Sequence, residues 1–148
     1  MIKKFIISSL FFLLLNNCGY SPIYSSKSLN FSINNIEKQN NILNNKFAEI
    51  IKGLVNNNDN RKINIGIESN KNVEIKSKDT KGNPLIYELN ISLTITIIDS
   101  NKKSKEFTEN TSFNNNDDKF ELSNYQKELE EILVRKLVEQ AIIYLSDL

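Results

Sequence analysis

The chain has 148 residues, of which 39% are hydrophobic and 25% charged, so it is able to form one globular domain with a buried core. It contains no histidine and one cysteine, which excludes histidine-based acid–base catalysis, Ser–His and Cys–His nucleophiles, the usual zinc sites and an intrachain disulfide. Residues 1–17 contain Lys3, Lys4 and no acid, so the remainder carries 17 basic and 18 acidic side chains. That balance lacks the basic excess of nucleic-acid-binding proteins. Composition therefore favours a protein that is not an enzyme and has no cofactor, metal or nucleic-acid partner.

The first segment, residues 1–17, has the layout of a secretory signal. Two lysines precede an apolar run over residues 5–15, and a polar break separates this run from Cys18. The run is too short to cross a bilayer, which needs about 20 apolar residues. A lone cysteine at this place predicts cleavage and lipidation as in lipoproteins, and Gly19 in place of Asp favours sorting to the outer membrane. The alternative is an ordinary secreted protein with a cysteine near its start.

The polar segment 18–28 then predicts a lipidated tether, and residues 29–148 are expected to form one domain. Leu29, Phe31 and Ile33 alternate with polar residues, which predicts a first short strand.

Residues 42–56 change to a helical period, because their apolar side chains recur every three or four positions. The predicted helix has Leu54 on its apolar face and Asn44 off that face. An Asn/Asp-rich turn at 56–59 is expected to end it.

Three strand patterns follow. Residues 61–68 predict a second strand, and Val73 and Ile75 predict a separate short piece before a turn over 79–84. The strongest alternation covers residues 85–97, which predicts a long strand with one buried face. A loop at 99–103 then leads to a fourth strand over 105–113.

Residues 123–146 predict a long terminal helix, since they combine an apolar stripe with the absence of Gly and Pro. Ser123 and Gln126 fit a capping box at its start. Glu131 and Arg135 are spaced for an ion pair within the helix.

Two amphipathic helices and a four-stranded sheet with one apolar face can bury each other, which predicts a two-layer α+β domain. The sheet is expected to be mostly antiparallel. The first strand–helix–strand unit is also compatible with a parallel crossover, which would make the sheet mixed.

The segment from Cys18 to Tyr24, Cys-Gly-Tyr-Ser-Pro-Ile-Tyr, resembles the start of one branch of the LptE lipoproteins, Cys-Gly-aromatic-x-Pro-Leu-Tyr. The rest of the mature chain resembles the family more loosely. It has a long strand ending at Asp99, a Thr-Ser-Phe segment at 111–113 before an acidic loop, and a terminal apolar helix.

This resemblance implies two helices on a four-stranded sheet, the fold that periodicity also predicts. LptE proteins sit at the outer membrane inside the lumen of the large β-barrel LptD. They plug this barrel, help it assemble and aid delivery of lipopolysaccharide to the outer leaflet. The implied partners are therefore an LptD-like barrel, lipopolysaccharide and the membrane that holds the lipid anchor.

The lysines around the 79–84 turn are candidate contact residues. Lys76, Lys78 and Lys81, with Lys71 nearby, are placed to meet lipid A phosphates or acidic groups of a barrel. Glu74 and Asp79 lie among them, which favours a solvated loop as the simpler interpretation.

Two further groups of side chains have an open interpretation. Tyr87, Phe107 and Phe113 fit the core better than a barrel-facing patch, because they lie on alternating strand faces. Ser92, Thr94 and Thr96 predict a polar sheet face, which suits either bulk water or the wet lumen of a barrel.

Two other functions compete with the barrel plug. One is a stand-alone lipoprotein that carries an amphiphile in a pocket between sheet and helices, and it predicts an exposed apolar cleft. The other is a structural lipoprotein that tethers the envelope. A plug predicts a mostly polar surface, which the Asn-rich sequence favours.

Overall fold

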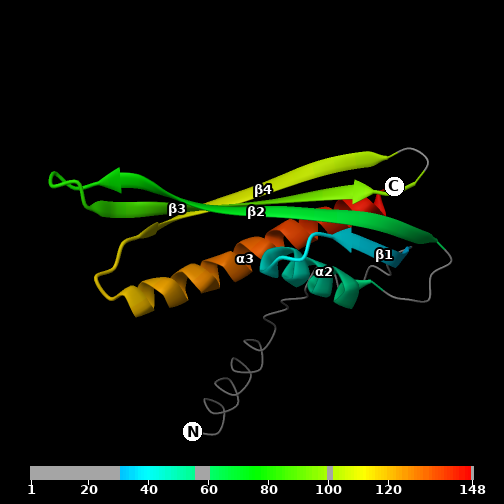
Figure 1. Ribbon diagram of the computed structural model, residues 1–148, viewed down its shortest axis with the longest axis horizontal. Helices are drawn as coiled ribbons and strands as arrows, with labels where there is room; N and C mark the ends of the chain where they lie inside the picture. Colours follow the sequence, from blue (N-terminus) through cyan, green and yellow to red (C-terminus); the bar gives the residue numbers. More distant parts are fainter. Residues whose placement is uncertain (1–30, 56–60, 100–101, 148) are drawn as a thin grey trace, which may run out of the picture.

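The computed structural model describes residues 31–55, 61–99 and 102–147. The predicted leader, Cys18, the predicted tether and the predicted turn at 56–59 lie outside these residues. The described chain has two layers, a four-stranded sheet and two helices that both lie on one side of it (Figure 1). The predicted α+β class is confirmed.

The chain order is strand, helix, three strands and helix. The elements are β1 (Ser32–Lys38), α2 (Ile42–Leu54), β2 (Lys62–Lys78), β3 (Pro84–Ile97), β4 (Lys103–Asn114) and α3 (Lys119–Ser146). The strands lie side by side in the order β1-β2-β3-β4. Because β1 pairs with β2 in parallel and the other pairs are antiparallel, the sheet is mixed.

The first strand lies later in the chain than the alternation at residues 29–33 predicted. It begins at Ser32, whose amide donates to the carbonyl oxygen of Arg61 at 2.7 Å. Phe31 precedes the strand and is fully buried in the core. The bounds of the first strand are set by pairing with the parallel strand β2, and the local pattern gave no indication of this pairing.

The predicted break between the second strand and the piece at Val73 and Ile75 is wrong, because β2 is one continuous strand of 17 residues. Its polar middle, including Lys71 and Asn72, stays extended because β3 pairs with it residue by residue. Strand pairing satisfies backbone groups whatever the side chain, so a polar stretch does not end the strand.

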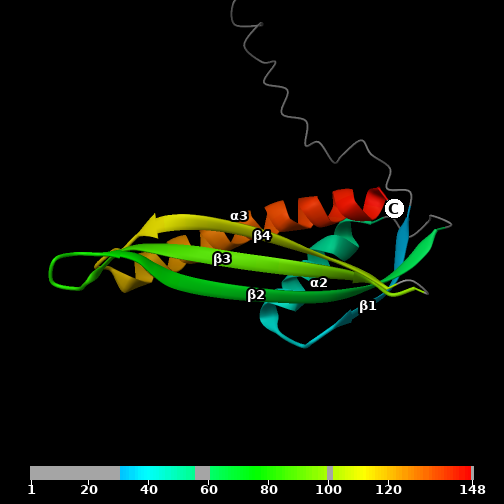
Figure 2. The ribbon, with the colours of Figure 1, turned by 90° about the horizontal axis from the view of Figure 1, so that it is seen from above.

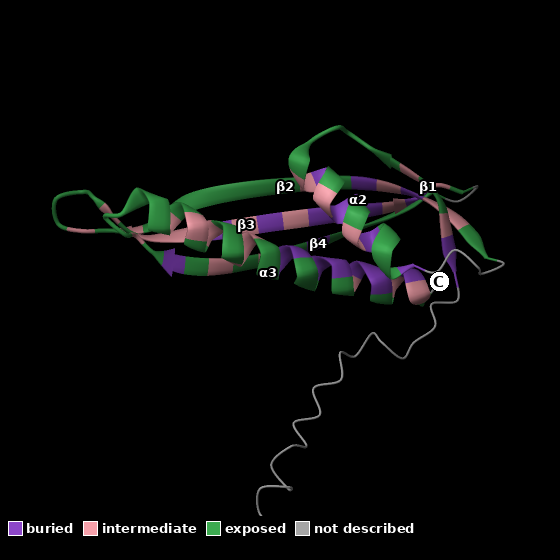
Figure 3. Cartoon of the chain, turned by 90° about the horizontal axis from the view of Figure 1, so that it is seen from below, coloured by how far each residue is buried: buried purple, intermediate pink, exposed green. Residues whose placement is uncertain are grey.

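One face of the sheet and the facing stripes of the helices form the core. On β3 the buried residues are Leu89, Ile91, Leu93, Ile95 and Ile97, every second position as predicted. Phe107 and Phe113 of β4 are buried and Tyr87 is half-buried against them, so their assignment to the core is confirmed. Figure 3 shows buried residues recurring along both helices and along the strands.

Helix α3 begins four residues before the predicted capping box. The carboxylate of Asp118 accepts from the amides of Phe120 and Glu121, at 2.9 and 3.1 Å, and so caps the helix. A carboxylate at this position satisfies two orphan amides and also interacts favourably with the helix dipole. Ser123 therefore lies inside the helix.

The predicted ion pair between Glu131 and Arg135 is also wrong. Arg135 Nε lies 3.4 Å from the backbone oxygen of Glu131, while the Glu131 carboxylate lies 3.7 Å from Lys46 Nζ on α2. Glu130 pairs with the same Lys46 at 3.6 Å and with Lys71 of β2 at 2.8 Å. These acids thus link α3 to its neighbours instead of to the next turn of the helix.

The faces of α2 differ from the prediction at two positions. Asn44 is buried, with 1% of its surface exposed, whereas Leu54 at the end of the helix is 46% exposed. Asn44 faces β2, where a polar partner satisfies its side chain.

The β2–β3 hairpin makes the molecule elongated. Its tip extends beyond both helices. The last residue of β3 and the first residue of β4 lie side by side at the opposite end of the sheet (Figure 2). The two ends of the sheet therefore present different surfaces.

Candidate functional site

The uncovered side of the sheet is a candidate functional surface of the described chain. We call it the open face. It comprises the side chains of Glu68, Asn70, Asn72 and Glu74 on β2, of Glu88, Asn90, Ser92, Thr94 and Thr96 on β3, and of Ser104, Glu106, Thr108, Asn110 and Ser112 on β4. Both helices contact the other side of the sheet (Figure 1).

The open face is polar, and ten of its fourteen residues are uncharged. Its centre consists of two cross-strand rows, Asn70–Ser92–Thr108 and Asn72–Asn90–Asn110. Near one end, the hydroxyl oxygens of Thr96 and Ser104 lie 2.9 Å apart. Amides and hydroxyls both donate and accept hydrogen bonds, so this surface can match a polar protein wall or bound water. The predicted polar face at Ser92, Thr94 and Thr96 is therefore part of a wider surface.

The Lys76 side chain lies against the open face and not at the hairpin tip. Its Nζ atom lies 2.6 Å from Glu88 Oε1 and 3.0 Å from Ser112 Oγ. Glu88 stands directly opposite Glu74 in the register, so Lys76 offsets the repulsion of two facing carboxylates. An ammonium group with these partners is less available to a phosphate than a free one.

Lys78 and Lys81 lie at the hairpin tip, where both are exposed and, among the described residues, neither forms an ion pair. Of the three candidate lysines, Lys76 is thus engaged with Glu88, while Lys78 and Lys81 are exposed and accessible to a ligand.

The tip itself is a tight turn organised by Asp79. Its Oδ1 atom accepts from the amides of Lys81 and Asn83, both at 2.8 Å, and its Oδ2 accepts from the Asn83 side chain at 2.9 Å. These donors, the Asn83 side chain first, hold the pKa of the Asp79 carboxyl below its ordinary value of 3.8. Gly82 adopts φ +88°, which favours glycine. Asp79 is therefore a turn residue, not a ligand for Lys78 or Lys81.

A groove of about 450 Å³ lies beside the first turns of α3, and no pattern in the sequence indicated it. It is lined by Ser112, Phe113, Asn114, Asn115, Asn116, Glu121, Leu122 and Tyr125. Its aromatic wall consists of Phe113 and Tyr125, with ring centroids 6.4 Å apart, and Tyr87 stacks on Phe113 at 5.5 Å. Asn115 donates to the Pro84 carbonyl oxygen at 2.9 Å, which ties this loop to the hairpin.

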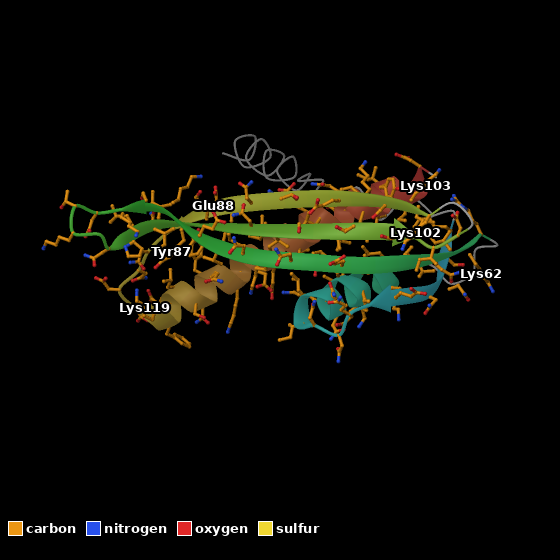
Figure 4. The ribbon with its side chains drawn as sticks, turned by 45° about the horizontal axis from the view of Figure 1, so that its top comes forward. Lys62, Tyr87, Glu88, Lys102, Lys103 and Lys119 are labelled. Atoms are coloured by element: carbon orange, nitrogen blue, oxygen red, sulfur yellow. The ribbon has the colours of Figure 1, made fainter. Side chains whose placement is uncertain are left out.

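Four cations gather at the other end of the sheet. Figure 4 shows Lys62, Lys102 and Lys103 at the end opposite to Lys119, Tyr87 and Glu88. Arg61 precedes Lys62, and both help to line a groove of about 320 Å³ with Lys103 and Asp99. Sequence reasoning missed this cluster because Arg61 and Lys103 are far apart in the chain.

The space between sheet and helices is filled. Within the described residues, buried aliphatic and aromatic side chains from α2, β2, β3, β4 and α3 form one continuous core, and the partly buried Ile33 and Ile36 of β1 pack against it. In the same part of the chain, no helix is both long and apolar enough to cross a membrane. Cys18 lies outside the described residues, so its predicted lipidation stays a prediction.

Comparison with known proteins places the fold. The sequence matches no family model and no curated protein. Its structure is similar to a minor lipoprotein from Acinetobacter baumannii, with a TM-score of 0.56, 18% identity, and coverage of 80% of this chain and 92% of that one. It is also similar to an uncharacterized lipoprotein B from Nitrosomonas europaea, with a TM-score of 0.53, 12% identity, and coverage of 79% and 84%. The described chain thus has the fold of these two bacterial lipoproteins.

Proposed function

We propose that this chain is a non-catalytic outer-membrane lipoprotein, anchored through Cys18, that plugs an LptD-like β-barrel and assists its assembly in lipopolysaccharide transport. The observation that carries the proposal is the open face, a broad polar surface that no element of the described chain covers. A domain that stands in the aqueous lumen of a barrel needs such a surface, because the lumen wall presents hydrogen-bonding and charged groups.

The fold supports the same proposal. Both structural neighbours are lipoproteins by name, and they share the two-layer arrangement with this chain. The leader with its cysteine at residue 18 and the segment to Tyr24 resemble lipoproteins of the LptE family, which act in this way. The two supports are independent, because the fold is compared over the described residues and the leader resemblance rests on sequence outside them.

The contrast with an amphiphile carrier rests on the interior. A carrier needs an apolar cavity, as small-molecule sites are concave and mostly apolar. In the described residues the core side chains that such a cavity would require are packed against one another, and Leu89, Ile91 and Leu93 are fully buried. The groove beside α3 is lined mainly by asparagine, serine and glutamate in addition to its aromatic wall. This favours a plug over a carrier.

The hairpin tip supplies the proposed contact with lipopolysaccharide. Lys78 and Lys81 are exposed beyond the helices, where a phosphate can approach without breaking an ion pair of the described residues. Lys76 is proposed to contact the barrel instead, together with Glu88 of the open face, with which it pairs.

The experiment that tests the proposal is mild detergent extraction of the full tagged chain from its native envelope, followed by identification of what co-purifies. We expect a large outer-membrane β-barrel at close to one copy per chain. Recovery of the chain alone, at its own mass, would contradict the plug and favour the solitary carrier. Mass spectrometry of the same sample measures the acyl groups on Cys18 separately.

A further inference from the structure

We propose that the cluster of Arg61, Lys62, Lys102 and Lys103, here called the basic end, docks on the anionic phospholipid headgroups of the leaflet that holds the lipid anchor. This inference rests on the proposed anchor at Cys18 and goes beyond the barrel and lipopolysaccharide contacts. The surface is distinct from the hairpin tip, since it lies at the opposite end of the sheet (Figure 4).

Strand pairing brings these four cations together. Lys62 begins β2 and Lys103 begins β4, and both strands flank the end of β3, where Ile97 pairs with Ile65 and with Lys103. Arg61 and Lys102 directly precede these strands. All four side chains are exposed, and among the described residues none of them forms an ion pair. The cations therefore point into solvent from one end of the molecule.

The balance of charge distinguishes the two ends. At the basic end the groove contains Arg61, Lys62 and Lys103 against a single acid, Asp99. Around the hairpin tip and the start of α3, Lys78, Lys81 and Lys119 lie among the acids Asp79, Asp117, Asp118 and Glu121. The groove with Arg61, Lys62 and Lys103 is therefore positive in balance within a chain that is close to neutral as a whole, while the adjoining groove places Lys102 beside Glu37, Glu68 and Asp99.

Chain connectivity places this end near the membrane. Phe31 is the first described residue, and the next residue, Ser32, is hydrogen-bonded to Arg61 at 2.7 Å. Cys18 precedes Phe31 by 13 residues, a length that spans about 45 Å at most when fully extended. The chain therefore joins the domain at the basic end, and a lipid anchor at Cys18 keeps that end within this distance of the leaflet.

Anionic headgroups fit this surface better than a specific ligand would. Exposed lysines and an arginine without fixed partners bind a fluid layer of phosphates through charge, and each one near an anionic surface strengthens association by roughly fivefold. Lys105 lies further along β4 and is engaged over the rings of Phe107 and Tyr144, at 5.3 and 5.0 Å. It is therefore excluded from the basic end.

The test measures how the full chain partitions between buffer and vesicles. The chain carries Cys18→Ser, a substitution that prevents attachment of a lipid anchor. We expect binding to vesicles of phosphatidylcholine with about one third phosphatidylglycerol to exceed binding to pure phosphatidylcholine, and to weaken in high salt. Replacing Arg61, Lys62, Lys102 and Lys103 by glutamine should lower the partition coefficient on anionic vesicles by more than tenfold. All chains carry the same leader, so the ratio between variants isolates the basic end.

The matched control replaces Lys52, Lys119, Lys127 and Arg135 by glutamine. These are also exposed and, within the described chain, form no ion pair, so the net charge changes equally. The control should lose less than threefold. Equal losses in both variants would overturn the proposal, as would unchanged binding in the basic-end variant. Loss of barrel co-purification without any loss of vesicle binding would also overturn it, by assigning these cations to a protein surface.

Discussion

Ser69 Oγ of β2 donates a hydrogen bond to Oδ1 of the buried Asn44 on α2, with the two oxygens 2.6 Å apart. The Asn44 side-chain nitrogen donates in turn to the carbonyl oxygen of Gln39 at 3.1 Å. One amide thus joins the helix, the sheet and the β1–α2 connection. A buried polar group in this position is stable only because both of its ends are satisfied.

Replacing Asn44 by Ala is expected to lower the free energy of unfolding by about 1–3 kcal/mol, because Ser69 and the Gln39 carbonyl both lose their partner. Urea denaturation measures this loss. Asn45→Ala is the matched control on the next residue, which is exposed, and it should change stability by less than about 0.5 kcal/mol. Equal effects of the two variants would contradict the role given to Asn44.

Two glycines are expected to respond in opposite directions to alanine. Gly82→Ala should destabilise the hairpin by about 1 kcal/mol, because φ is +88° at this position. Gly53→Ala should stabilise the protein by about 0.5–1 kcal/mol, since it lies in α2 and a Cβ there meets nothing within 4 Å. Thermal unfolding of both variants measures the signs. A stabilising Gly82→Ala would show that the turn does not require its left-handed conformation.

The hairpin tip should loosen in acid. Hydrogen bonds from Asn83, Lys81 and Gly82 depress the pKa of the Asp79 carboxyl below 3.8 in the folded chain. A depressed folded pKa means that the stabilisation is complete above the unfolded pKa and is lost as pH falls through the lower folded pKa. The protection of the Lys81 and Asn83 amides, which is their NMR exchange rate relative to the intrinsic rate at the same pH, should therefore fall as the pH is lowered below about 4. In Asp79→Asn this acid-dependent step should be absent; its persistence would assign the step to another group.

Charge reversal separates the candidate lysines. Lys78→Glu together with Lys81→Glu is expected to weaken lipopolysaccharide binding by about tenfold, because two proposed phosphate contacts become repulsive. Lys52→Glu together with Lys127→Glu is the control of equal net charge and should change binding by about twofold or less. Binding to immobilised lipopolysaccharide measures both. If both double variants bind equally, the tip does not contact the phosphates.

Much of the fold follows from local pattern. The alternation in β3 identified Leu89 and Ile95 as buried and Ser92 as solvent-facing, because a half-buried strand imposes a period of two on its own residues. The terminal helix and the composition of the sheet were predictable for the same reason.

What the pattern missed depends on partners elsewhere in the chain. The helical period alone places Asn44 on the surface, and only its hydrogen bond with Ser69 explains why it is buried. Asp118 is likewise assigned to a loop, because its role as the cap of α3 depends on where the helix begins. The continuity of β2 requires knowledge of β3 as its partner. The same holds for the site, because only strand pairing brings Arg61 to Lys103 or ties Lys76 to Glu88.

The central claim is that the open face lies against the wall of an outer-membrane barrel. The most direct measurement is to place a photocrosslinking amino acid at Ser92, in the middle row of the open face, and to irradiate cells that express the full chain. We predict one dominant adduct, at the combined mass of the chain and a large β-barrel, with barrel peptides from the lumen wall. The absence of a barrel adduct at Ser92, or adducts with lipid alone, would contradict the account.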